Sequence, residues 1–205
     1  MDTTTVAAFL AVDLLLVFTP GADWAYAITA GLRDRSVVPA VAGLIAGYAG
    51  YTALAVAGLV VIVANSATVL TALTVAGAAY LMWLGWGVLS RPSVLGASTK
   101  AMPSSRRLIM LKGAGISGLN PKALLLYFSL FPQFIDPGAR WPVAAQIGLL
   151  GTLHMTACAV VYLAVGVLAR TVLKTRPSAA RAVTRASGAM MIVIGGFLLV
   201  ERLAG

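Results

Sequence analysis

The sequence predicts an all-α integral membrane protein, in which six transmembrane helices form two inverted three-helix repeats. Three observations predict this class: 60% of the 205 residues are apolar, only 10% are charged, and the mean hydropathy is +0.94. The apolar residues come in blocks of roughly twenty or more, which is the length that a helix needs to cross a bilayer. A water-soluble domain does not have this composition. We therefore expect a single transmembrane domain over residues 1–205.

Six apolar blocks are long enough to span the bilayer: Val6 to Leu32, Val37 to Ala64, Thr68 to Ser90, Leu108 to Ile135, Val143 to Ala169 and Ser187 to Leu203. Most of the 15 lysines and arginines lie in the connections after the first, third and fifth blocks. By the positive-inside rule these connections are cytoplasmic, and both termini are outside. Topology thus explains the net charge of +9, and no nucleic-acid partner is expected.

The polar connection from Arg91 to Arg107 divides the chain into halves, about 1–90 and 107–205, which this cytoplasmic linker joins. Each half contains three blocks. Because three is odd, the second half enters the membrane in the opposite sense, as in the inverted repeats of secondary transporters. Pro20 and Pro121 occupy corresponding places in the first block of each half.

Both prolines lie in polar interruptions of an apolar block, Thr19-Pro20-Gly21-Ala22-Asp23 and Asn120-Pro121-Lys122. Proline removes a backbone donor and clashes with the preceding turn, so the first and fourth helices are predicted to be broken. Irregular backbone at membrane depth persists where it faces protein or a watery cavity. Freed amides at such a break suit a carboxylate, and freed carbonyls suit an ammonium group.

Lys122 and Asp23 are charges at membrane depth, and each needs a partner of opposite charge. We expect them to pair, directly or through water, until a zwitterionic substrate replaces the pair. The alternative is a static pair that holds the two halves in register. The predicted substrate-binding residues are Thr19, Pro20, Gly21, Asp23, Asn120, Pro121 and Lys122.

Three residues are candidates for proton coupling. Asp23 is the first, because a buried carboxylate is protonated more easily once its cationic partner leaves. Asp13 and His154 are further candidates; the alternatives are a wet position in the outer vestibule for Asp13 and a hydrogen-bonded packing histidine for His154. The single cysteine, Cys158, lies in an apolar block and is interpreted as packing. No metal or cofactor is expected.

The motifs TPGAD, NPKA (Asn120 to Ala123) and FPQF (Phe131 to Phe134) together resemble the LysE/RhtB family of amino-acid exporters, whose members usually have TPGP, NPKA and PQF at these places. The resemblance implies efflux of amino acids or close derivatives across the bacterial inner membrane, driven by the proton-motive force, and it allows homo-oligomers. It is nearer to the threonine and homoserine branch, which favours a neutral substrate. Ala22 departs from the pattern, where a second proline is usual.

Three other functions are each compatible with part of the sequence. Metal-ion carriers belong to the same superfamily, but the intramembrane residues include no clustered ligands. Gly115-Ile116-Ser117-Gly118 matches the GxSG of rhomboid-like intramembrane proteases, with His154 as the base, although that histidine is in the fifth block rather than the sixth. A non-transporting membrane subunit would not need paired breaks. We therefore expect a transporter rather than an enzyme.

Glycines in the second block and a tryptophan in the first predict further contacts. Gly43, Gly47 and Gly50 of the second block lie at near-helical spacing and are predicted to let another helix approach closely. Trp24 directly follows the first break, where it either lines the site or packs against a helix.

Overall fold

The computed structural model describes residues 1–32, 37–59, 66–90 and 105–169, together with scattered positions between 182 and 200. Regular structure in these ranges is helical, and no strand occurs in them. The elements are α1 (Thr3–Val17), α2 (Ala22–Leu32), α3 (Val37–Leu54), the π-helical η1 (Ala55–Leu59), α5 (Ala67–Ser90), α6 (Arg106–Gly118), α7 (Pro121–Leu125), η2 (Leu126–Leu130), η3 (Phe131–Phe134) and α8 (Val143–Leu168).

Apolar helices long enough to cross a membrane confirm the membrane class. Val37–Gly58, with 22 residues, and α8, with 26, pass this test individually, and α1 with α2 passes as one span bent by 57°. The predicted span Ser187 to Leu203 falls where only scattered positions are described. The arrangement as six helices in two inverted repeats therefore stays a prediction.

Both predicted helix breaks are confirmed. In the first block, α1 ends at Val17 and α2 begins at Ala22, so that Pro20 lies between the two half-helices. In the fourth block, α6 ends at Gly118 and Pro121 is the first residue of α7. Proline is favoured at the first position of a helix, because its missing N–H would have no intrahelical partner there.

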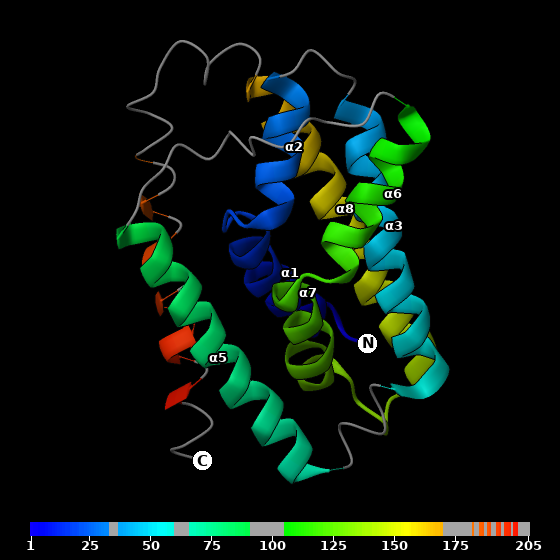
Figure 1. Ribbon diagram of the computed structural model, residues 1–205. Helices are drawn as coiled ribbons and strands as arrows, with labels where there is room; N and C mark the ends of the chain where they lie inside the picture. The colour runs from blue at the N-terminus through cyan, green and yellow to red at the C-terminus, as the bar shows by residue number, and fades with distance from the viewer. Residues whose placement is uncertain are drawn as a thin grey trace.

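The direction of the helices agrees with the charge pattern. In Figure 1, the C-terminal ends of α2, α5 and α8 and the N-terminal ends of α3 and α6 lie toward the upper edge of the molecule. The three basic connections therefore leave the helices from the same end. Most of the basic residues in these connections lie outside the described residues.

A close contact between α3 and α6 fixes the position of the second break. A Cβ atom added at Gly43 would clash with the backbone of Met110, and one added at Gly113 would lie 2.8 Å from the carbonyl oxygen of Ala40. Gly47 is similarly close to Gly118, directly before the second break. These contacts confirm the predicted close approach at Gly43 and Gly47, whereas a Cβ at Gly50 would meet nothing within 4 Å.

An aromatic cluster closes the core beside the second break. The Phe9 ring of α1 packs edge-on against Phe131 and Phe134 of η3, with both pairs of ring centroids 5.4 Å apart. Tyr127 of η2 packs against Phe131 at 4.4 Å. The FPQF motif thus holds the end of the fourth block against the first half of the first.

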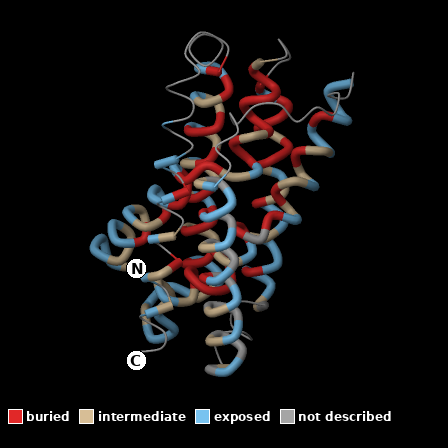
Figure 2. The backbone as a smooth tube through the Cα atoms, turned by 60° about the vertical axis from the view of Figure 1, so that its left-hand side comes forward, coloured by how far each residue is buried: buried red, intermediate tan, exposed pale blue. Residues whose placement is uncertain are grey.

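Buried residues gather where the helices meet, and the outward turns are exposed (Figure 2). Unusually for a core, this one contains charged side chains. The buried polar residues are Asp13, Thr19, Asp23, Thr29, Ser117, Asn120, Lys122, Ser129, Gln146 and His154. Because burying a charge is costly unless it is paired or hydrogen-bonded, the contacts of these residues define a candidate site.

Candidate functional site

The two breaks face each other and exchange hydrogen bonds. Asn120, from the second break, donates from Nδ2 to Oδ2 of Asp23 at 2.7 Å. Lys122 reaches back to the first break, where its Nζ donates to the carbonyl oxygens of Leu16 and Thr19, each at 2.9 Å. The structure therefore brings the predicted residues of both breaks into one site.

Lys122 is only 8% exposed, and its position in the first turn of α7 places a cation where the helix dipole disfavours it. The carbonyls of Leu16 and Thr19 offset this cost. They belong to the C-terminal end of α1 and to the break after it, where carbonyl groups carry partial negative charge and need donors. The break in the first helix thus supplies the acceptors that make a buried lysine tolerable.

Asp23 lies in the first turn of α2, where the helix dipole stabilises a carboxylate. Its Oδ2 accepts from Tyr48 Oη at 2.8 Å as well as from Asn120, while its Oδ1 is buried without a hydrogen-bond partner among the described residues. Asp23 and Lys122 do not form a direct ion pair, because backbone carbonyls hold the ammonium and the Asn120 amide holds the carboxylate. Lys122 and Asp23 were expected to pair either directly or through water, and the structure has no direct contact between the two charged groups.

The other predicted residues shape the two breaks. Thr19 Oγ1 donates to the carbonyl of Leu15 at 2.7 Å. A Cβ atom at Gly21 would lie 4.0 Å from Lys122 Nζ, so Gly21 is beside the ammonium group. Asn120 caps α7, since its Oδ1 accepts from the backbone N–H of Lys122 at 3.0 Å. Pro20 lies inside the first break, and Pro121 begins the helix after the second.

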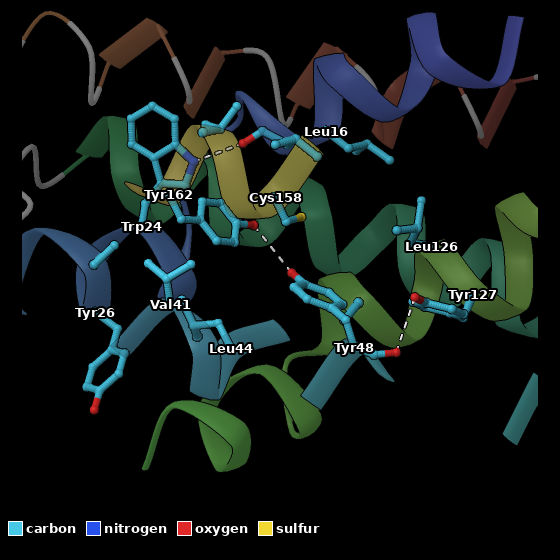
Figure 3. Close-up of a cluster of buried hydrophobic side chains, with 14 of the residues drawn as sticks. Leu16, Trp24, Tyr26, Val41, Leu44, Tyr48, Leu126, Tyr127, Cys158 and Tyr162 are labelled. Carbon is cyan, nitrogen blue, oxygen red and sulfur yellow. Dashed lines mark hydrogen bonds between the residues drawn. The ribbon is translucent and has the colours of Figure 1, made fainter. Parts of the chain in front are cut away.

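Two aromatic residues adjoin the site. Trp24 Nε1 donates to the carbonyl of Val17 at 2.8 Å and thereby spans the first break, a structural role (Figure 3). Tyr48 of α3, which the sequence did not single out, bonds to Asp23, and its hydroxyl lies 3.3 Å from that of Tyr162 (Figure 3). The signal available in the sequence was weak: a buried tyrosine hydroxyl usually finds a partner.

Asp13 and His154 form a second polar cluster. His154 Nδ1 lies 2.7 Å from Asp13 Oδ1, and Cys158 Sγ lies 3.5 Å from His154 Nε2. Asp13 is fully buried, so its alternative interpretation as a wet vestibule position is wrong. Its other oxygen, Oδ2, has no partner among the described residues. The Tyr48 ring contacts His154 edge-on, with 4.6 Å between ring centroids, and so lies between the two clusters.

A small cavity touches both clusters. Its volume is about 10 Å³, which is close to the space that one water molecule needs. Lys122, Tyr48, Tyr162 and His154 line it, together with apolar residues that include Leu16 and Leu126. The surface that faces this small space is apolar, although four of the lining residues carry polar groups.

The described residues do not have the geometry that metal transport or intramembrane proteolysis would require. Within the described part of the chain, no group of three or more histidine, cysteine, aspartate or glutamate side chains could hold a metal ion. The hydroxyl of Ser117 is buried without a hydrogen-bond partner there, and His154 contacts Asp13 instead. Neither the metal carrier nor the rhomboid-like protease gains support.

The fold and the site define a class: a polytopic membrane protein with a buried polar site between two broken helices, an arrangement typical of secondary transporters. Residues 14–202 match the model of the LysE type translocator family. The chain therefore belongs to this family, and the resemblance of its TPG and NPKA motifs to that family is confirmed.

Relatives cover most of the chain. An uncharacterized membrane protein of Vibrio cholerae is 34% identical over 78% of each chain. A homoserine/homoserine lactone efflux protein of Salmonella typhimurium is 29% identical over 95% of this chain and 96% of its own. A leucine efflux protein of Klebsiella pneumoniae is 29% identical over 72% of this chain and 71% of its own. No solved structure matches the chain.

Proposed function

We propose that this protein is a secondary active exporter of small neutral amino acids or close derivatives. The observation that carries the proposal is the reciprocal contact between the two breaks, in which Lys122 and Asp23 are buried charges on opposite sides of one site. The efflux of homoserine and of leucine by relatives supports a neutral amino acid as the substrate. Homoserine and leucine are zwitterions, which need one cationic and one anionic partner; homoserine lactone, also in the name of the Salmonella typhimurium relative, has an ammonium group and no carboxylate.

The substrate carboxylate binds near Lys122, and its ammonium group binds near Asp23 or at the freed carbonyls. Asp23 Oδ1 has no hydrogen-bond partner in the part of the chain that the structure describes, and it is available as an acceptor. The first helical hydrogen bond of α2 runs from Ala25 N to Gly21 O, and the amides before it have no intrahelical partner. These amides and the helix dipole add a second feature that favours a carboxylate.

Proton coupling involves Asp23 and the Asp13–His154 cluster. The substrate carboxylate competes with Asp23 for the positive charge of Lys122, so substrate binding at Lys122 and the charge on Asp23 are linked. Tyr48 connects the two clusters, because its hydroxyl donates to Asp23 and its ring packs against His154. The proton gradient then drives the substrate outward.

In the cell, the protein occupies the bacterial inner membrane with both termini outside and the basic connections in the cytoplasm. Exposed apolar side chains such as Leu54, Val160 and Val167 face the lipid. The two halves of the single domain move relative to each other to open the site on alternate sides. Homo-oligomers are compatible with this arrangement.

Counterflow in proteoliposomes tests the function. Liposomes with purified protein are loaded with one unlabelled amino acid and diluted into the labelled form, over a panel that includes homoserine, leucine and lysine, with and without a proton gradient. The proposal expects transient accumulation of a neutral amino acid and a faster rate with the gradient. Accumulation of lysine alone, or of no amino acid, contradicts it.

Ser117→Ala is a matched control within the same region. Ser117 is buried one turn before the second break, but its hydroxyl contacts no partner among the described residues. The exporter proposal therefore expects normal counterflow from this variant. A protease would instead lose its activity, because the serine would be its nucleophile.

A further inference from the structure

We infer that the carbonyl oxygens of Leu16 and Thr19 form a binding site for a primary ammonium group, and that Lys122 is its resident, displaceable occupant. The inference deepens the proposed function, on which it rests for the identity of the substrate. It assigns the α-ammonium group of the substrate to these two carbonyls, which Lys122 vacates when a substrate carboxylate draws it away.

The end of α1 singles out this position. The carbonyl of Leu14 accepts from Phe18 N, that of Leu15 from the Thr19 hydroxyl, and that of Val17 from Trp24 Nε1. These donors all belong to the first break or to the start of α2. The Leu16 carbonyl also accepts from Thr19 N at 3.1 Å; the Lys122 ammonium is an additional donor, which comes from the other half of the protein, 106 residues away from Leu16. It is therefore a donor that a relative movement of the halves can withdraw.

The geometry at Lys122 suits an exchange between ammonium groups. A lysine ammonium has three N–H donors, and the carbonyls of Leu16 and Thr19 account for two of them. The space beside Lys122 has a volume of only about 10 Å³, so the two halves must move apart before a substrate carboxylate can meet the ammonium group. The new charge-assisted hydrogen bond competes with the two carbonyl contacts and favours withdrawal of Lys122.

This arrangement makes the site selective for zwitterions. A simple amine must compete with a tethered ammonium whose effective concentration at the carbonyls is very high. An amino acid brings its own carboxylate, which removes the competitor, and its ammonium group then satisfies the carbonyls that Lys122 leaves. Without that replacement, two buried carbonyls would lose their cationic donor, which is costly.

The test uses Lys122→Ala and n-propylamine, because the three carbons and the amine of this molecule replace the atoms that the substitution removes. Thermal unfolding of purified protein in detergent is measured against amine concentration. The inference expects the melting temperature of Lys122→Ala to rise with the logarithm of propylamine concentration, as for a ligand of the folded state. Wild-type protein should not respond, because Lys122 fills its site.

Three controls make the response specific. The neutral isostere 1-propanol should have no effect on Lys122→Ala, and Lys122→Met, whose side chain refills the space without charge, should not respond to the amine. Lys112→Ala removes a lysine from the middle of α6 and should behave as wild type. If Lys122→Ala is too unstable to purify, propylamine throughout purification should restore its yield.

Equal shifts in Lys122→Ala and wild type, or no response and no restored yield, overturn the inference. The assay requires no transport, so its outcome is separate from that of the proposed function. An amine response without amino-acid counterflow leaves the ammonium site in place and refutes the exporter. Counterflow without an amine response supports the exporter and refutes the site.

Discussion

The two breaks have a proline at the corresponding place but opposite chemistry. The first break presents acceptors: Leu15, Leu16 and Val17 offer carbonyls that side chains satisfy. The second break is capped by its own Asn120, whose carbonyl oxygen accepts from the backbone while its amide group reaches Asp23. The first break therefore accepts hydrogen bonds from neighbouring side chains, and the second break donates hydrogen bonds through Asn120 and Lys122.

This difference explains how two buried charges coexist without a direct ion pair. Lys122 balances the negative end of α1, and Asp23 benefits from the positive end of α2 and from two neutral donors. The ammonium group of a zwitterion can take the place of Lys122 at the carbonyls, and its carboxylate can take the place of Asp23 as an acceptor. The comparison predicts that changes at the contacts between the breaks affect transport most, and that changes far from both affect it least.

Asp23→Asn removes the charge from the first break while it keeps the shape of the side chain. We expect counterflow to fall by about 100-fold or more, because a hydrogen-bonded charge contributes roughly 3 kcal/mol and each 1.4 kcal/mol is a factor of ten. Initial rates in proteoliposomes measure the effect. An Asp23→Asn rate near that of wild type would mean that the carboxylate is not part of the site.

Tyr48→Phe removes one neutral hydrogen-bond donor to Asp23 and should reduce the counterflow rate by about tenfold.

Gly43→Ala tests what positions the second break. The added methyl group would overlap the backbone of Met110 in α6, so we expect a loss of about 1–3 kcal/mol of folding free energy. Thermal unfolding in detergent measures the loss. Gly50→Ala on the same helix is the matched control: a methyl there meets nothing within 4 Å, so stability should stay unchanged or rise slightly. Equal effects of the two changes would contradict the close contact.

Asp13→Asn tests whether Asp13, in α1 before the first break, takes part in proton coupling. This change keeps the shape of the side chain and a polar contact with His154 but removes the carboxylate. We expect the stimulation of transport by an imposed proton gradient to fall several-fold, with counterflow at symmetrical pH largely retained. Ser117→Ala, which leaves the contacts of Asp13 and His154 unchanged, serves as the control. A full response to the gradient in Asp13→Asn would exclude this cluster from coupling.

Asp2, distant from both breaks, should give the smallest effect. It caps α1, and the hydrogen bond from Thr5 N lowers the pKa of its fully exposed carboxyl below the usual 3.8. A lowered pKa contributes stability that is present above pH 3.8 and lost as the pH falls through the folded-state value. Asp2→Ala should therefore lower the melting temperature slightly at neutral pH and not at all well below pH 3. A large loss of transport would contradict its remoteness from the site.

The breaks were predictable because their causes are local. Proline and polar residues inside an apolar block mark a broken helix from the sequence alone, and Pro20 and Pro121 lie where the helices break. The predicted α3 contact at Gly43 rests on the same kind of local signal. Family motifs around these residues then led to the correct family.

The contacts across the site were not predictable in the same way. Asp13 and His154 are 141 residues apart, and nothing in either block indicates that their side chains meet. The partners of Lys122 are backbone carbonyls, which every residue has and which therefore leave no mark in the sequence. The sequence analysis assigned the freed carbonyls of a break to the ammonium group of a substrate, whereas in the structure they bind the ammonium group of Lys122.

Substrate binding to Lys122→Ala tests the central claim most directly. Equilibrium binding of the labelled amino acid that wild type transports best is measured for wild type, Lys122→Ala and Lys112→Ala in detergent. The account predicts about 100-fold weaker binding for Lys122→Ala, through loss of a charge-assisted contact of roughly 3 kcal/mol, and unchanged binding for Lys112→Ala. Wild-type affinity in Lys122→Ala would contradict the account, because the substrate would then bind without the cation that links the two breaks.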